Sequence, residues 1–409
     1  MAETVSHITL STEIGFEKME YATCLLQATN ELQKKSSSID GLFLWSSTKK
    51  SMTRWNHSAG TSSVGFTPPH YLRPMNIGII GSGSYCTAII KILTDNKTAG
   101  NRGIGAINWW IRKEETAQHI RQFHRNPSYM SAVDIHPEKI NIFTDINEVA
   151  AASDILLLGT PSAFLHNALE GLSKVGLDGK RWVTVIKGVV PQTNEIIADY
   201  ICNTYNTKME NVAMLTGPSH AEEIALEKLT YLTFASPDEG YAKQLAAVFS
   251  NHYIKSIISN DLAGAEYATV LKNVFALASG IYHGLGYGDN FHAFFITNAL
   301  KEIKRFVNTV SPAERDIEES AYLGDLLVTS YSHFSRNRML GTLIGKGYTV
   351  KEALAEMNMV AEGYFATKSM TEINKKHKVD LPILEAVFNI LYQNAAVAAE
   401  MRKLCDRLD

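Results

Sequence analysis

The chain has only four cysteines, and their arrangement suggests neither a metal site nor a disulfide framework. Cys24, Cys86, Cys202 and Cys405 lie far apart, show no Cys-x-x-Cys spacing and have no clustered histidines beside them. A structural zinc site and a small disulfide-stabilised fold are therefore not predicted. A reducing cytoplasm is the compartment that this cysteine usage favours.

Two further absences narrow the class of partner. The formal net charge of −3 offers no basic field for nucleic acid. No uninterrupted apolar run reaches the roughly 18 residues that a membrane-spanning helix requires. The 409 residues are 45% hydrophobic, which is enough apolar material for two ordinary domains. We therefore expect a soluble protein that binds small molecules, with no nucleic-acid partner and no stable membrane insertion.

The first 74 residues lack a sustained periodic pattern. Serine, threonine and proline clusters interrupt the segment, and only residues 13–34 carry an imperfect helical stripe. The segment has no apolar core of a secretory signal, and its acidic residues argue against a transit peptide. We predict a poorly ordered extension over 1–74 that adds little to the fold, with Met75 as a candidate native start.

A dinucleotide signal follows this segment. Residues 76–80 form a short apolar run, Gly81-Ser82-Gly83 a tight turn, and the residues from Ser84 onward an apolar helix. Gly81 would permit the turn, and Gly83 would let the backbone approach a pyrophosphate at the helix N-terminus. Cys86 stands where the third glycine of the pattern is expected. An ordinary strand-to-helix turn is the alternative.

The residues after the second strand bear on the choice of nicotinamide cofactor. That strand is predicted at 106–111, and Arg112-Lys113 follow it where an NAD-specific site would place an acidic residue on the ribose. NADP is therefore allowed beside NAD. Glu114 and Glu115 are expected to complement a helix N-terminus.

The alternation of strands and helices predicts the fold class. Further strands are expected at 140–143, 155–158, 183–186 and 212–215, and several of them end in polar turns such as Lys187-Gly188. From Asp261 onward helices replace strands, with a capping box at Thr349-x-x-Glu352 and Pro382 in the first turn of the final long helix. We predict an α/β Rossmann-type, doubly wound parallel sheet over 75–260, with its ligand crevice at the strands' carboxyl ends. An all-helical C-terminal domain over 261–409 should follow.

Lys272 lies in the middle of a largely apolar helical segment. A buried ammonium group is desolvated, so its pKa falls and its proton becomes easier to move. A reductase requires such a donor beside a carbonyl oxygen. The alternative is a lysine that reaches solvent from the helix edge. In the same half, Asp325 could equally be a helix cap, and Arg336 a solvent-facing charge.

Taken together, the motifs of the chain resemble NAD(P)-dependent glycerol-3-phosphate dehydrogenase of the bacterial, soluble type. The similarity covers Met75 to about the C-terminus. Its motifs are Lys187-Gly188, Gly217-Pro218-Ser219, Leu271-Lys272-Asn273, Gly284-Leu285-Gly286-Tyr287-Gly288-Asp289-Asn290, Gly324-Asp325-Leu326 and Ser335-Arg336-Asn337. Two residues depart from the family pattern: Cys86 replaces a glycine, and His220 stands where an aromatic residue is common.

The resemblance implies roles for individual residues. Lys272, Lys187 and Asp325 would be catalytic, with Lys272 giving and taking the proton while hydride passes to C2 of dihydroxyacetone phosphate. The substrate would be held by Lys187, Gly217, Ser219, Asn273, Asp325, Thr329, Ser335, Arg336 and Asn337. The cofactor, NAD or NADP, would be lined by Gly81, Gly83, Ser84, Tyr85, Arg112, Lys187, Ala221, Arg336 and Glu362. The product, sn-glycerol 3-phosphate, would supply the glycerophospholipid backbone, and a homodimer is what the family suggests.

Two other functions stay open at this point. A reductase of the β-hydroxyacid or ketopantoate type shares the Rossmann half, the helical half and a catalytic lysine, but its substrate carries a carboxylate instead of a phosphate. A non-catalytic dinucleotide-binding sensor would keep the glycine turn without needing Lys187, Lys272, Asp325 and Arg336 together.

Overall fold

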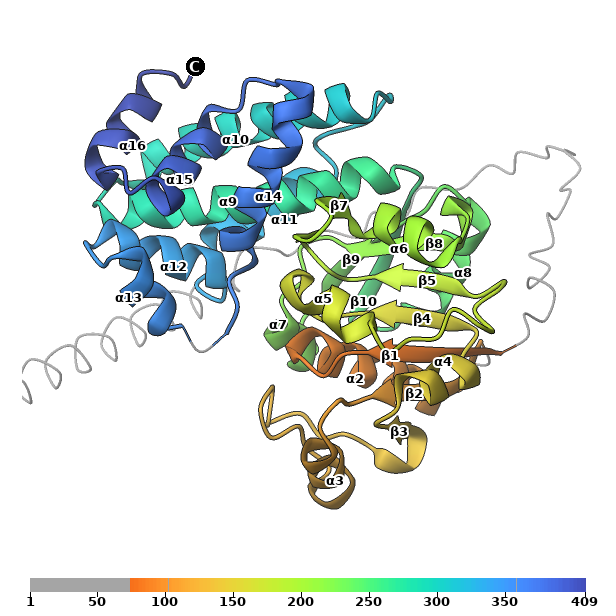
Figure 1. The fold of residues 1–409 in the computed structure, drawn as a ribbon. Helices are drawn as coiled ribbons and strands as arrows, with labels where there is room; N and C mark the ends of the chain where they lie inside the picture. Colours follow the sequence, from red (N-terminus) through yellow and green to blue (C-terminus); the bar gives the residue numbers. More distant parts are fainter. Residues whose placement is uncertain (1–73, 102, 358) are drawn as a thin grey trace, which may run out of the picture. The chain divides into compact units, whose positions relative to one another are not determined.

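The structure, a computed structural model, describes residues 74–101, 103–357 and 359–409. These residues lie within one compact unit, 68–409, in which an α/β half is followed by a helical half (Figure 1). The predictions for the N-terminal extension lie outside the described residues. No helix in the described part of the chain is both long and apolar enough to cross a membrane.

The α/β half is built on one mostly parallel sheet. In the described residues its strand order is β10-β9-β8-β5-β4-β1-β2-β3. The strands are β1 (Met75–Ile80), β2 (Ile104–Trp110), β3 (Asn141–Phe143), β4 (Ile155–Leu158), β5 (Arg181–Thr184), β8 (Val212–Thr216), β9 (Thr230–Ala235) and β10 (Ile254–Ser259). Only β8 and β9 run antiparallel among these neighbours. Since the order reverses between β1 and β4, the carboxyl ends of these strands flank a natural ligand crevice.

Helices cover both faces of the sheet, which confirms the doubly wound prediction (Figure 1). Successive side chains of a strand point to opposite faces, so Ile79 of β1 packs into one core cluster and Ile80 into the other. The first face carries α2 (Ser84–Thr98), α3 (Glu114–Phe123), α7 (Ala221–Ala225) and α8 (Glu239–Phe249). The second carries α4 (Ile146–Ala152), α5 (Ser162–Leu169) and α6 (Ile197–Tyr205). Short elements between them are β6 (Val189–Val190), β7 (Glu195–Ile196) and the 3-10 turns Pro137–Lys139 and Met209–Asn211.

The helical half is organised around α9 (Leu262–Gly284), which is buried along most of its length. The remaining helices are α10 (Asp289–Val310), α11 (Asp325–Tyr331), α12 (Arg336–Gly345), α13 (Val350–Ala355), α14 (Glu362–His377), α15 (Pro382–Tyr392) and α16 (Val397–Cys405), with a π-turn η3 at Ser320–Gly324. Helix α12 lies against α9 through glycines on both helices. A Cβ atom at Gly280 would lie 2.1 Å from the Arg338 carbonyl oxygen, and one at Gly341 would lie 2.0 Å from that of Leu277.

Several local predictions differ from the structure. Strands β9 and β10 were not predicted, and β5 starts two residues before the predicted strand at 183–186. Pro382 does open a helix, but α16 follows it, so α15 is not the final helix. The Thr349 capping box is confirmed at α13, and Glu114 and Glu115 lie in the first turn of α3 as expected. The division into two domains at 260/261 stays a prediction.

Candidate active site

One cleft of about 770 Å³ gathers residues from both halves of the unit. All of the predicted site residues line it except Gly217. The polar turns after three strands contribute Thr160, Lys187 and Ser219. This agrees with the predicted crevice at the carboxyl ends of the strands. The helical half contributes residues from α9, α11, α12 and α14. The cleft therefore combines residues that are up to about 280 positions apart in sequence, from Gly81 to Glu362.

The centre of the helical side of the cleft is a cluster of two lysines and one carboxylate. The Lys187 ammonium donates to both Asp325 oxygens at 3.2 Å. The Lys272 ammonium donates to Asp325 Oδ1 and, at 2.7 Å, to the Thr329 hydroxyl. Side-chain exposure is 18% for Lys187, 4% for Lys272 and 1% for Asp325. Lys272 thus does not reach solvent, so the helix-edge alternative is wrong.

The charges of this cluster do not balance, because one carboxylate faces two ammonium groups. Burial would raise the pKa of Asp325, but Lys187 and Lys272 hold it below its ordinary value. Burial also opposes the charge of Lys187, yet Asp325 raises the pKa of this lysine. For Lys272 burial dominates and Lys187 adds to it, so its pKa falls to about 7 despite Asp325. Lys272 is therefore the group of the cluster that can exchange a proton near neutral pH.

Hydroxyl groups complete the surroundings of the carboxylate. Thr216, the last residue of β8, donates to Asp325 Oδ2 at 3.3 Å and lies 3.0 Å from the Thr269 hydroxyl. The Thr329 hydroxyl donates to the Asp325 carbonyl at 2.7 Å, which leaves its lone pair for Lys272. Thr216 was not predicted. Its only signal in the sequence is that it directly precedes the Gly217-Pro218-Ser219 turn.

A chain of amide groups joins the two halves beside this cluster. Asn273 Nδ2 donates to the Lys187 carbonyl at 2.7 Å, and Asn337 Nδ2 donates to Asn273 Oδ1 at 2.8 Å. The Gly363 N–H then donates to Asn337 Oδ1 at 2.8 Å. Both asparagines line the cleft, but these contacts already fix their orientation. They therefore hold Lys187, α9, α12 and α14 in register.

The first turn of α12 presents Ser335 and Arg336 to the cleft. Ser335 is the N-cap, and its hydroxyl accepts from the Arg338 N–H at 3.3 Å. Arg336 is exposed, which agrees with the alternative prediction of a solvent-facing charge, but it also lines the cleft. Its Nη1 donates to the Val360 carbonyl at 3.0 Å, so the guanidinium keeps further donors for a ligand.

Glu362 ties the start of α14 to the start of α5. Its carboxylate accepts from the Ser162 N–H at 3.0 Å and from the Ser162 hydroxyl. Burial raises the pKa of Glu362, although the Ser162 contacts and the Arg336 charge act in the other direction. The carboxylate satisfies an N–H group at the α5 N-terminus that no intrahelical carbonyl could satisfy.

The glycine turn requires glycine at Gly81 and leaves open space at Gly83. Gly81 has a φ of +129°, and a Cβ atom there would lie 3.0 Å from the Gly159 backbone. At Gly83 a Cβ atom would meet no atom within 4 Å, so this position faces open space in the cleft. Cys86 is fully buried, and its sulfur fills the space beside Gly159, where a Cβ atom would lie 2.2 Å from it. The missing third glycine is thus offset by a glycine on the neighbouring strand end.

Tyr85 and Ser219 connect the turn to the lysine cluster. The Ser219 hydroxyl donates to the Gly217 carbonyl at 3.0 Å, so the Tyr85 hydroxyl, 2.9 Å away, donates to Ser219. The Gly217 carbonyl also accepts from Lys187 at 3.3 Å. Gly217 has a φ of +105° and does not line the cleft, so it acts through this carbonyl.

Arg112 and Ala221, which the resemblance assigns to the cofactor, both line the cleft. Arg112 follows β2 and is exposed, and Ala221 is the buried first residue of α7. His220 also lines the cleft, and its Nε2 is hidden from solvent without a hydrogen-bond partner among the described residues. Burial, Lys272 and Lys187 together lower the pKa of His220 to about 4. The ring is therefore neutral at physiological pH.

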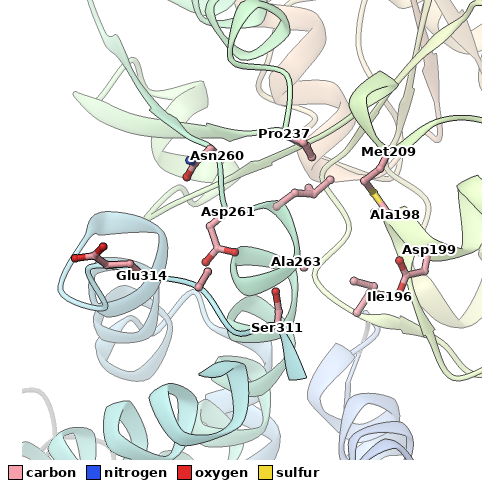
Figure 2. Close-up of a pocket in the computed structure, with 12 residues that line it drawn as sticks. Ile196, Ala198, Asp199, Met209, Pro237, Asn260, Asp261, Ala263, Ser311 and Glu314 are labelled. Carbon is pink, nitrogen blue, oxygen red and sulfur yellow. The ribbon is translucent and has the colours of Figure 1, made fainter. Parts of the chain in front are cut away.

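A second cavity, of about 450 Å³, contains none of the predicted site residues. Figure 2 shows Asp261 and Ser311 in the middle of the view and Asp199 and Met209 on its right side. The Asp261 carboxylate is already held by Arg315 Nε at 2.6 Å and by the Gly264 N–H at 3.0 Å. These contacts lower the pKa of Asp261 against the effect of burial and give it a structural role. The larger cleft is therefore the candidate active site.

Family comparisons agree with this geometry. Residues 76–242 match the family described as NAD-dependent glycerol-3-phosphate dehydrogenase N-terminus, and residues 261–402 match the corresponding C-terminus. An NAD(P)+-dependent glycerol-3-phosphate dehydrogenase of Salinibacter ruber is 33% identical over 320 residues, which are 78% of this chain and 91% of that protein. One from Staphylococcus haemolyticus is also 33% identical, over 81% of this chain and 98% of its own length.

Solved structures of the same family also resemble the chain. The glycerol-3-phosphate dehydrogenase of Coxiella burnetii has a TM-score of 0.74 at 25% identity and covers 81% of this chain and 99% of its own. The one from Saccharomyces cerevisiae has a TM-score of 0.69 at 26% identity over the same shares. A D-mandelate dehydrogenase has a TM-score of 0.52 at 17% identity, a likeness of fold alone.

Proposed function

Because the chain belongs to the NAD-dependent glycerol-3-phosphate dehydrogenase family, we propose that Lys272, Lys187 and Asp325 carry out its reversible, NAD(P)H-dependent reduction of dihydroxyacetone phosphate to sn-glycerol 3-phosphate. The observation that carries these assignments is that the buried Lys272 and the partly buried Lys187 both bind one buried carboxylate at the cleft. A sensor that only binds the cofactor has no need for this unbalanced charge, which costs stability when buried.

Lys272 gives the proton to the substrate oxygen during reduction and takes it back during oxidation. Its lowered pKa makes both forms available near neutral pH. Asp325 orients the ammonium, and Thr329 supplies its second contact. Lys187, the more exposed of the two lysines, stays charged and polarises the substrate oxygen. The proton and the positive field thus come from two different lysines.

The substrate phosphate is held at the first turn of α12. Arg336 offers a planar set of donors that matches phosphate, and Ser335 and Asn337 add neutral groups beside it. Asn273, Ser219 and the Gly217 carbonyl keep Lys187 and the turn before α7 in place. Selection for phosphate over carboxylate then rests on Arg336 and its neighbours. Recognition of this group separates the proposed reaction from the β-hydroxyacid and ketopantoate alternatives.

The residues at the other end of the cleft fit a dinucleotide. The open space at Gly83 would be filled by any Cβ atom, and α2 has no side-chain cap at its N-terminus. Gly81, Gly83, Ser84 and Tyr85 would hold the pyrophosphate region, with Arg112 at the ribose and Ala221, Lys187, Arg336 and Glu362 lining the remainder. When bound, the nicotinamide supplies or accepts the hydride.

A turnover assay tests the assignment directly. NADH and NADPH absorbance is followed in separate reactions with dihydroxyacetone phosphate, and then with ketopantoate and with a β-oxo acid, the oxidised form of a β-hydroxy acid. We expect turnover with the phosphate substrate only. Turnover with the carboxylate substrates instead would show that the chain acts as a β-hydroxyacid or ketopantoate reductase. Tight cofactor binding without any turnover would favour the sensor.

Three finer statements belong to the same proposal. The enzyme would act as a homodimer, reside in the cytoplasm and supply the backbone of glycerophospholipids. The three cysteines of the described region, Cys86, Cys202 and Cys405, are free thiols, which is consistent with a reducing compartment. Sedimentation of the purified chain at micromolar concentration tests the dimer.

A further inference from the structure

Three carbonyl groups of the glycine turn are each held by a buried side chain. The Trp109 indole donates to the Gly81 carbonyl at 2.7 Å, and the Asn126 amide donates to the Ser82 carbonyl at 2.9 Å. The Thr87 hydroxyl donates to the Gly83 carbonyl at 3.1 Å. These side chains are fully buried and come from β2, from the loop after α3 and from α2.

Asn126 connects the glycine turn to a second segment, the loop that contains Ser128 and Tyr129. Its Nδ2 also lies 3.0 Å from the Thr87 hydroxyl oxygen. Its Oδ1 accepts from the N–H groups of Ser128 at 3.1 Å and Tyr129 at 3.2 Å. Tyr129 lines the cleft. One buried amide therefore fastens the glycine turn to the loop that carries Tyr129 to the cofactor end.

The direction of the carbonyls decides what the turn offers a ligand. Carbonyl oxygens that pointed into the cleft would repel a pyrophosphate, whereas N–H groups at a helix N-terminus attract it. With Gly81, Ser82 and Gly83 held from inside the protein, their carbonyl oxygens are already engaged away from a ligand. Helix α2 is 15 residues long and has no side-chain cap. The turn is thus arranged for an anion before any ligand arrives.

We propose that Asn126 is a positioning residue for the dinucleotide: it sets cofactor affinity by holding the glycine turn and the Tyr129 loop together, without contact with the lysine cluster. This inference rests on the proposed cofactor site. It predicts a loss confined to cofactor binding, because the hydrogen bonds of Asn126 go to Ser82, Thr87, Ser128 and Tyr129 and to no residue at the substrate end.

The test compares Asn126→Ala with Asn108→Ala in the full chain. Asn108 is also fully buried, but its amide binds Ala152, Ser153 and Asn141 instead of the turn. NADH affinity is measured by fluorescence titration, together with the thermal midpoint and the KM for dihydroxyacetone phosphate. In Asn126→Ala we expect the NADH Kd to rise roughly tenfold, as for the loss of well-formed hydrogen bonds, with the substrate KM nearly unchanged. Asn108→Ala should lower the thermal midpoint comparably and leave the NADH Kd within about twofold.

A second variant keeps the test decisive if Asn126→Ala does not fold. Thr87→Val has nearly the same shape, yet it removes the hydroxyl that binds the Gly83 carbonyl and Asn126. It should raise the NADH Kd about threefold. Wild-type affinity in both turn variants, or an equal loss in Asn108→Ala, would overturn the positioning role. A wild-type chain that does not bind NADH would refute the proposed function itself, which is a distinguishable result.

Discussion

The two ends of the cleft are built from different kinds of group. At the cofactor end, neutral side chains such as Trp109 and Asn126 hold backbone carbonyls, and the ligand would meet backbone N–H groups. At the substrate end, three charges lie together with little exposure to solvent, on Lys187, Lys272 and Asp325. The difference shows that binding and proton transfer make opposite demands on a protein.

The three side chains that hold the carbonyls of the glycine turn, Trp109, Asn126 and Thr87, carry no charge. At the charged end the proposed proton transfer depends on an imbalance, because a single carboxylate cannot neutralise two ammonium groups. Changes at the charged end should therefore act on rate and its pH dependence, whereas changes at the neutral end should act on affinity. Five variants of the chain examine this contrast.

The largest effect is expected from Lys272→Ala. Loss of the proton donor should lower kcat by at least roughly 10²-fold, while NADH binding stays nearly intact because Lys272 is not part of the glycine turn. The measurements are steady-state kcat and NADH titration on the same preparation. Near-normal turnover would remove Lys272 from the mechanism, and weak NADH binding would show that the two ends are not separate.

The pH dependence should move in opposite directions in two other variants. In the wild type, reduction requires protonated Lys272 and should decline as pH rises through about 7, whereas oxidation should increase over the same range. Lys187 lowers the pKa of Lys272 and Asp325 raises it. Lys187→Met should therefore shift the pH profiles of both reduction and oxidation to higher pH. Asp325→Asn should shift both profiles to lower pH, and each shift should be at least about one pH unit.

The measurement is kcat/KM against pH for both reaction directions, with Thr216→Val as a control that keeps every charge of the cluster. If the pH profiles of the two variants shifted in the same direction, the proposed division of roles between the lysines would be contradicted.

A smaller effect is expected from Arg336→Lys, which keeps the charge but loses the planar set of donors. The KM for dihydroxyacetone phosphate should rise roughly tenfold, with a smaller change in NADH affinity. Arg305→Lys, on the outer face of α10, is the matched control because its guanidinium binds the Asp380 carbonyl away from the cleft. An unchanged substrate KM in Arg336→Lys would move the phosphate site elsewhere.

The smallest effect concerns the ribose. Arg112→Ala should weaken NADPH about fivefold and leave NADH within about twofold, because only NADPH carries a 2′-phosphate and the contact is exposed. Titrations of the two cofactors against the same protein provide the ratio. Equal losses for both would show that Arg112 binds a group that they share.

The sequence predicts those parts of the molecule whose cause is local. The glycine turn, the Thr349 capping box and the apolar strands of the central sheet each depend on residues within a few positions. Strands β9 and β10 were missed because polar residues interrupt their apolar pattern. Thr230 and Thr233 do so in β9, and Lys255 and Ser256 do so in β10, which is an edge strand. Strand β5 was placed late because Val185 and Ile186 are buried beyond its end.

The candidate site follows the same rule. Lys272 stood out because it is a charge in an apolar helix. The two residues that surround its ammonium group lie far from it in sequence: Asp325 is 53 positions after Lys272, and Lys187 is 85 positions before it. Asn126 binds the nearby N–H groups of Ser128 and Tyr129, but its contacts with the glycine turn reach 39 and 44 positions back along the chain, and nothing local indicates them. Only the resemblance to a known family brought the separated motifs together, and it identifies residues that touch ligands better than those that hold them in place.

The fit of Cys86 beside Gly159 has a consequence for how this sequence can change over evolutionary time. A methyl group at position 159 would collide with the sulfur, whereas a glycine at position 86 would leave a gap that a larger residue at 159 could fill. The two positions are therefore coupled: alanine at 159 requires the Cys86 sulfur to shift, whereas glycine at 86 removes this contact. Gly159→Ala should accordingly be tolerated better together with Cys86→Gly than alone.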